Sequence, residues 1–290
     1  CRPLQGSPAK RGEQHAETAS SAVASDPASG GVGGTTGLGP QVVAFAGRAI
    51  RRFLRSSETV VNTAIFPLLL LLTLLAAFSE AVEAFEGGDY VQRLVPTLVV
   101  SGVMFGSIGA AYGLLGDLQS GFMDRIRSLP VAPLSLLLGT AIAELARALA
   151  AIAVLVGAGF VFGFRFLDGP AGAVGFVVAG AMLGPVLVWI GLAMATMTSS
   201  LETLGPPLGA IFLLLLFFSQ GMVPLEAYPG WAQPVVRASP ITAYVELLDV
   251  LARGGSVNGP VLRAIAWSVV LVLGFGGLAT FRLSRTADRT

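Results

Sequence analysis

Few side chains in this chain could do chemistry, and two of them lie within a long apolar stretch. Glu144 and Arg147 are three residues apart between about residues 134 and 160, where most residues are apolar. On a helix this spacing places both on one face, where opposite charges can neutralise each other. Charged side chains inside a membrane-spanning helix are costly and often functional. Both a structural ion pair that joins helices and a role in gating or substrate contact would explain them.

The rest of the chain offers little to an enzyme. His15, Cys1 and Lys10 are the only histidine, cysteine and lysine, and all three lie near the N-terminus. A P-loop needs the pattern G-x-x-x-x-G-K-[ST], whose lysine reaches the nucleotide phosphates, and this chain lacks it. We therefore expect a non-enzymatic chain with no catalytic residue, no metal site and no cofactor of its own.

The composition indicates an integral membrane protein. Of the 290 residues, 54% are hydrophobic and only 12% are charged, whereas soluble domains carry about 25% charged residues. Several apolar stretches are long enough to cross a hydrocarbon core of about 30 Å. We expect an all-α membrane protein that contains six transmembrane helices. The expected spans are about Val60–Phe78, Leu94–Leu115, Leu134–Phe160, Ala171–Met197, Leu208–Met222 and Val261–Phe281.

The first 57 residues divide into two parts. Residues 1–40 are rich in Gly, Ser, Ala and Thr without apolar periodicity, which predicts a disordered tail. Residues 41–57 are predicted to form an amphipathic helix that lies in the membrane interface and attracts anionic lipid. An ordinary basic flank of the first span is the alternative. The basic face consists of Arg48, Arg51, Arg52 and Arg55.

The distribution of basic residues predicts the orientation of residues 58–290, the expected six-span domain. Arginines gather before the first span, in the segment that follows the second, and after the sixth. Basic residues favour the cytoplasmic side of a membrane. We therefore expect a multi-pass protein of the cell membrane with both termini in the cytoplasm.

The segment between the second and third spans carries an apolar stripe. Phe122, Met123, Ile126 and Leu129 recur at helical spacing, with Arg125 and Arg127 off the stripe. An apolar stripe exposed to the cytoplasm either docks into a partner or folds back onto the membrane surface. The stripe alone does not decide between these two.

The region from Pro206 to Gly255 predicts a shaped outer mouth. An apolar block ends at Ser219–Pro224, a turn follows, and an amphipathic stretch then runs from Val235 to Leu251. Its aromatic residues are explained by an interfacial belt or by a substrate gate, whereas Glu246 and Asp249 are expected on a solvated face. The gate candidates are Gly221, Pro224, Tyr228 and Trp231.

Several of these stretches, taken in order, resemble the type-2 ABC exporter permeases, especially the daunorubicin-resistance-type membrane subunits of actinobacteria. The resemblance covers about Arg48 to Arg285, and the Gly/Ser-rich tail departs from it. The stretches that carry it are Arg125–Leu134, Gly163–Phe166, Phe217–Leu225, Tyr228–Trp231, Gln233–Pro234, Ser239–Ile241 and Gly254–Gly255.

The resemblance implies a permease that works with two copies of a separate P-loop ATPase, which would bind ATP and Mg²⁺. It also implies a second six-span permease or a second copy of this chain. Re-entrant helices on the outer side would occupy about Leu225–Ala252. Residues 41–56 and the segment after the second span would dock the ATPase. The residues carried over for docking in that segment are Gly121, Phe122, Met123, Arg125, Ile126, Arg127 and Leu129.

These observations together predict the membrane subunit of an ATP-driven exporter, of the kind that confers antibiotic resistance. The scarcity of charge within the spans favours a hydrophobic drug or lipid-like substrate. We expect the chain to contact membrane lipids and to bind no nucleic acid. The alternatives are an exporter of a polysaccharide or lipid-linked glycan, and a proton-coupled secondary transporter that uses Glu144 without an ATPase.

Overall fold

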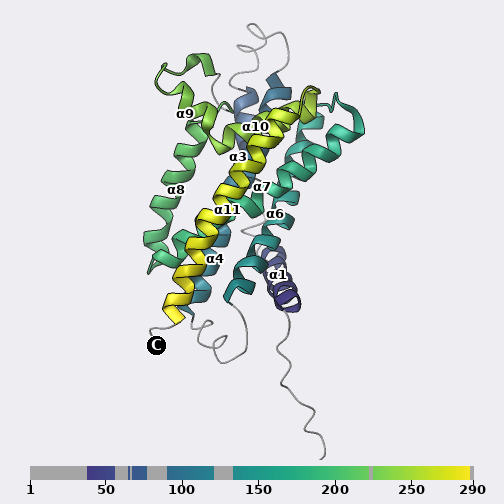
Figure 1. The fold of residues 1–290 in the computed structure, drawn as a ribbon. Helices are drawn as coiled ribbons and strands as arrows, with labels where there is room; N and C mark the ends of the chain where they lie inside the picture. The colour runs from purple at the N-terminus through teal and green to yellow at the C-terminus, as the bar shows by residue number, and fades with distance from the viewer. Residues whose placement is uncertain are drawn as a thin grey trace, which may run out of the picture. The chain divides into compact units, whose positions relative to one another are not determined.

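A computed structural model describes residues 38–55, 65, 67–76, 90–120, 133–221 and 225–287. All regular structure in these ranges is helical, and they contain no β-strand. The residues from Thr36 onward form one compact unit, and Figure 1 shows its helices running side by side. The expected all-α class is confirmed. The predicted disordered tail comprises residues 1–40, of which residues 1–37 lie outside the described residues. Its last three residues, Leu38 to Pro40, are instead the first residues of a helix, so disorder was predicted too far along the chain.

Among the described residues, four helical segments are long and apolar enough to cross a membrane. The first is the pair α3 (Tyr90–Gly106) and α4 (Ile108–Gln119), which are interrupted only at Ser107. The others are α6 (Pro133–Val161), α7 (Gly169–Met197) and α11 (Asn258–Ala287). They correspond to the second, third, fourth and sixth expected spans. Each extends beyond both predicted ends, except that α7 ends at Met197 as predicted.

The first and fifth expected spans are represented by shorter apolar helices. Pro67–Ala76 falls within the first of them, and α8 (Leu201–Phe217) corresponds to the fifth. The six-span count therefore stays a prediction. The helix α8 begins seven residues before the expected start at Leu208, because the Ser200 hydroxyl caps it by accepting a hydrogen bond from the Thr203 amide. Pro206 and Pro207 consequently lie inside the helix instead of preceding it.

The predicted amphipathic helix at the N-terminus is present as α1 (Leu38–Arg55). It packs along α6, and Phe45, Ala46 and Phe53 face the protein. Gly139 of α6 permits this approach, since a Cβ atom there would lie 2.5 Å from the Phe45 Cβ and 3.0 Å from the Ala46 nitrogen. The placement of α1 in a membrane interface stays a prediction.

The helix α7 forms the centre of the packing and contacts α3, α4, α6, α10 and α11. Small residues let these helices approach closely, as in other membrane helix bundles. A Cβ on Gly184 would lie 3.1 Å from the Glu144 carbonyl oxygen of α6, and one on Gly191 would lie 2.9 Å from the Ala111 Cβ of α4. The buried core is therefore organised around α7.

The segment after α8, where re-entrant helices were expected over about Leu225–Ala252, is divided into short elements. They are the 3₁₀ turn η1 (Leu225–Ala227), α9 (Gln233–Ala238) and α10 (Pro240–Arg253). Pro240 occupies the first turn of α10, where its missing N–H costs no hydrogen bond, and Gly254 and Gly255 adopt positive φ where the chain turns into α11. These elements lie at the opposite end of the unit from α1 (Figure 1).

Candidate functional site

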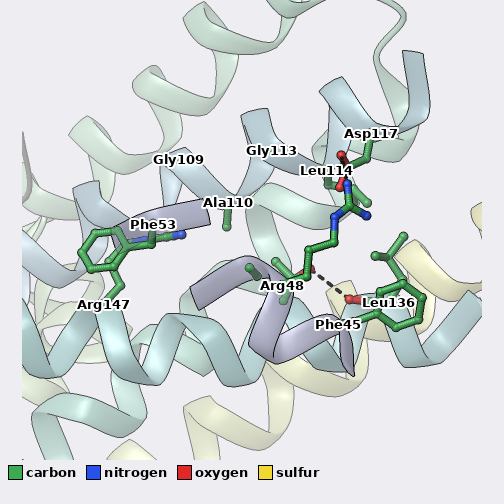
Figure 2. A pocket seen from close by; sticks show the side chains of 12 residues that line it. Phe45, Arg48, Phe53, Gly109, Ala110, Gly113, Leu114, Asp117, Leu136 and Arg147 are labelled. Atoms are coloured by element: carbon green, nitrogen blue, oxygen red, sulfur yellow. Dashed lines mark hydrogen bonds and ion pairs between the residues drawn. The ribbon is translucent and has the colours of Figure 1, made fainter. Parts of the chain in front are cut away.

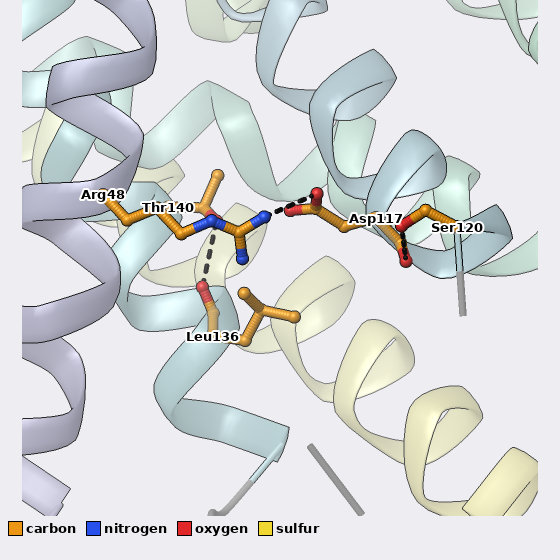
Figure 3. Close-up of polar contacts among 5 residues, drawn as sticks. All are labelled: Arg48, Asp117, Ser120, Leu136 and Thr140. Carbon is orange, nitrogen blue, oxygen red and sulfur yellow. Dashed lines mark hydrogen bonds and ion pairs between the residues drawn. The ribbon is translucent and has the colours of Figure 1, made fainter. Parts of the chain in front are cut away.

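The basic helix α1 is joined to the end of α4 by an ion pair. The Arg48 Nη2 atom lies 3.1 Å from the Asp117 Oδ1 atom, and the Asp117 side chain is only 13% exposed. Figure 3 shows the Arg48 guanidinium between Asp117 and the start of α6, close to Leu136 and Thr140. Arg48 therefore points into the protein, whereas Arg51 and Arg55 remain exposed. The side chain of Arg52 lies outside the described residues.

The pair Glu144 and Arg147 is formed and almost completely buried. Their side chains make an ion pair within α6 and are 2% and 10% exposed. The Phe53 ring of α1 covers the Arg147 guanidinium, with 5.3 Å between the guanidinium carbon and the ring centroid. The Nε atom of Arg147 is buried without a hydrogen-bond partner among the described residues. A buried arginine of α6 is thus in direct contact with α1.

A cavity of about 290 Å³ is lined by residues of α1, α4 and α6. Arg48 and Asp117 line one part of it, and Phe53 and Arg147 line another (Figure 2). Small residues of α4, among them Gly109 and Gly113, form the opposite wall. Movement of α1 would therefore change two ion-pair environments at once, one on α4 and one on α6.

The predicted docking residues lie outside the described part of the chain. They are Gly121, Phe122, Met123, Arg125, Ile126, Arg127 and Leu129. Their neighbours are defined, because α4 ends at Gln119 immediately before them and α6 begins at Pro133 after them. The Gln119 side-chain amide donates a hydrogen bond to the Ser199 carbonyl oxygen, 2.8 Å away, and so fixes the end of α4 to the turn before α8.

Among the predicted gate residues, Tyr228 makes the most specific contact. Its hydroxyl lies 2.5 Å from the Phe217 carbonyl oxygen and 3.0 Å from that of Ser219, so the O–H can donate to the end of α8. Burial raises the pKa of Tyr228 above its ordinary value, although the hydrogen bond to Ser219 opposes this shift. The hydroxyl therefore remains a protonated donor at neutral pH.

The other gate candidates are placed differently. A Cβ at Gly221 would lie 2.8 Å from the Thr97 Cγ2 atom of α3, so this glycine permits close packing. Trp231 is 72% exposed. Pro224 lies outside the described residues. The structure therefore brings Tyr228 and Gly221 to the end of α8 and leaves Trp231 at the surface.

Sequence reasoning identified the pair of Glu144 and Arg147 but missed the partners of three other carboxylates. Asp117 follows the predicted end of the second span at Leu115, but it lies within α4 and is paired with Arg48 of α1. Glu246 and Asp249 were expected on a solvated face, but both are partly buried and ion-paired, Glu246 with Arg263 and Asp249 with Arg253. Only the Asp249–Arg253 pair had a local signal, namely its i, i+4 spacing.

No group of three or more His, Cys, Asp or Glu side chains in the described ranges is arranged to hold a metal ion.

Comparison with known proteins places most of the chain in the family of ABC transporter permeases that the sequence stretches resemble. A sequence model of the ABC-2 type transporter family matches residues 40–251, which run from α1 into α10. The probable doxorubicin resistance ABC transporter permease protein DrrC of Mycobacterium tuberculosis is 26% identical over 234 residues, covering 79% of this chain and 82% of the relative.

Two further relatives carry similar names. The daunorubicin resistance ABC transporter permease protein DrrB1 of Streptomyces coeruleorubidus is 29% identical over 241 residues, covering 83% of this chain and 84% of the relative. The doxorubicin resistance ABC transporter permease protein DrrB of Mycobacterium tuberculosis is 27% identical over 239 residues, covering 78% and 83%. The family match to residues 40–251 includes both the residues that line the cavity beside α1 and the segment around Tyr228.

Proposed function

The chain belongs to the ABC-2 type transporter family, and from this premise we propose that it exports a hydrophobic drug or lipid-like compound from the cytoplasm or inner leaflet. It is a membrane subunit of an ABC transporter, not an enzyme. The observation that carries the proposal is the match to drug-resistance permeases over about four-fifths of the chain. The apolar character of its long helices supports a hydrophobic substrate over a sugar polymer.

The energy source would be a separate P-loop ATPase, present in two copies and binding ATP and Mg²⁺. Residues 121–129, together with α1, would form the docking surface for this partner. The ion pair between Arg48 and Asp117 supports the assignment, because Asp117 lies four residues before the docking segment and is bonded to α1. A displacement at the docking surface would then reach α6 through the contact between Phe53 and Arg147.

The functional assembly would contain a second permease, either another six-span protein or a copy of this chain. Both termini would lie in the cytoplasm, and residues 225–252 would form re-entrant helices on the outer side. The hydrogen bond from Tyr228 to the end of α8 supports an outer gate, because it links this segment to a helix that exposes Leu213, Leu214 and Phe217. Such apolar exposure on α8 favours contact with lipid or with a second permease.

Affinity purification in mild detergent from the native membrane tests the assembly. We expect a stoichiometric P-loop ATPase to be recovered with this chain. A second permease will be recovered as well if the exporter is heteromeric, and none if it contains two copies of this chain. If no ATPase is recovered after cross-linking, the proposed energy source is wrong. Efflux of doxorubicin from cells that express the recovered components would then test the substrate class. Export of only a glycan would overturn the proposal of a hydrophobic substrate.

The docking assignment has its own test. We expect Phe122→Glu to abolish ATP-dependent efflux while membrane insertion and purification yield stay unchanged. The control is Asp124→Asn, a substitution beside the predicted stripe. Normal efflux by the Phe122→Glu variant would contradict docking through this segment.

A further inference from the structure

A long apolar groove lies on the opposite side of α6 from α1, away from the charged cavity. Its volume is about 710 Å³, and it is lined by residues of α6, α7, α10 and α11. On α7 the lining runs from Gly175 to Trp189, which corresponds to about 20 Å at a rise of about 1.5 Å per residue. Ile142, Met182 and Ile265 are about half exposed along it, so the groove is open on one side.

Three of the four lining helices are among those long and apolar enough to cross a membrane. The open side of the groove therefore faces the hydrocarbon region when α6, α7 and α11 cross the bilayer. One leaflet contributes about 15 Å to a hydrocarbon core of about 30 Å. The length of the groove is thus similar to the depth that one lipid chain occupies.

The polar groups in the groove are already bonded to each other. The Tyr244 hydroxyl lies 2.8 Å from the Ser268 hydroxyl oxygen, and the Ser268 hydroxyl donates to the Ala264 carbonyl oxygen at 2.6 Å. The remaining lining side chains are apolar, apart from the indole N–H of Trp189. A ligand with its own polar groups would leave most of them without a hydrogen-bond partner here, which disfavours binding. A hydrocarbon chain incurs no such cost.

We propose that this groove is a binding site for one acyl chain of a membrane phospholipid. The bound chain fills the space between α6 and α11 and packs against Trp189 and Tyr244. The proposal requires that α6, α7 and α11 cross the membrane, but it does not depend on the identity of the exported compound.

Tryptophan fluorescence can test the site, since Trp189 lines the groove and the chain contains only two other tryptophans, Trp231 and Trp267. The variant Trp231→Phe/Trp267→Phe retains Trp189 alone. In detergent, it is titrated with phosphatidylcholine that carries two bromine atoms at mid-chain, which quench tryptophan on contact. We expect saturable quenching at one or a few lipids per protein, and none with unbrominated lipid.

A second single-tryptophan variant, Trp189→Phe/Trp267→Phe, retains the exposed Trp231 and measures non-specific contact with lipid. We expect at least threefold less quenching for it. Equal, non-saturating quenching of both tryptophans would overturn the proposal, because it would indicate only the general lipid surroundings. Absence of quenching of Trp189 would also overturn it.

A matched pair of substitutions on α7 tests the groove itself. Val178 lines it, whereas Val174, one turn away and similarly exposed, does not. In the Trp189 background, Val178→Phe should raise the lipid concentration for half-maximal quenching by at least fivefold, and Val174→Phe should leave it unchanged. Equal effects of the two substitutions would contradict binding in the groove. If Val178→Phe fails to fold, the comparison of Trp189 with Trp231 still decides the outcome.

Discussion

The two ends of this helical unit both carry arginine–carboxylate pairs, but their surroundings differ. Near α1, the pair of Glu144 and Arg147 is almost completely buried. At the α10 end, the pair of Glu246 and Arg263 retains 25% and 45% exposure. Removal of one partner from a buried pair leaves a charge without solvent and costs about 3–5 kcal/mol, whereas exposed pairs contribute about 0–1 kcal/mol. Burial, and not residue type, therefore decides which pairs hold the structure.

The largest expected effect concerns the buried pair. Arg147→Met should lower the free energy of unfolding by about 3–5 kcal/mol, because Glu144 is then buried without its counter-charge. The double variant Glu144→Gln/Arg147→Met should recover most of this loss. Titration with a denaturing detergent, followed by circular dichroism, measures both. A single variant as stable as the unchanged chain would remove the distinction between the two ends.

The next effect tests how tightly α1 is packed. Gly139→Ala should destabilise the chain by about 1–3 kcal/mol, because the new methyl group overlaps Phe45 and the backbone at Ala46. Gly157 lies on the same helix with open space around it, so Gly157→Ala should be neutral or stabilising by up to about 1 kcal/mol. The same unfolding titration compares them. Equal stability of both variants would show that α1 is not held closely against α6.

Loss of the ion pair between Arg48 and Asp117 should lower the free energy of unfolding by an intermediate amount, because only Asp117 is well buried. We expect Asp117→Asn and Arg48→Gln each to cost about 1 kcal/mol, with a coupling energy of similar size in the double variant. If α1 transmits motion to α4, both single variants should also reduce ATP-dependent efflux. Additive losses in the double-mutant cycle would argue against a direct interaction between the two residues.

The smallest effect is expected at the α10 end. Arg263→Gln should change the free energy of unfolding by less than about 1 kcal/mol, and the change should shrink further at high salt. Measurement at low and high ionic strength checks this. A loss as large as that of Arg147→Met would show that the pair with Glu246 is shielded from solvent, and the contrast between the ends would then disappear.

Local patterns in the sequence determined the helical, membrane-spanning character of the chain. The apolar runs of α6, α7 and α11 are long enough to define spans by themselves, and the i, i+3 spacing of Glu144 and Arg147 brings them together on any helix. The amphipathic helix α1 follows from periodicity in the same way. Helix ends were less predictable, because the cap at Ser200 extends α8 across two prolines.

Contacts between distant residues were decided only by the tertiary structure. Arg48 and Asp117 are 69 residues apart, and no local pattern indicates that this arginine points inward while Arg51 and Arg55 stay exposed. The contact of Phe53 with Arg147 and the groove between α6, α7, α10 and α11 arise in the same way. The physical reason is that periodicity fixes which residues share a face of one helix, whereas the packing of small residues such as Gly139 fixes which faces meet.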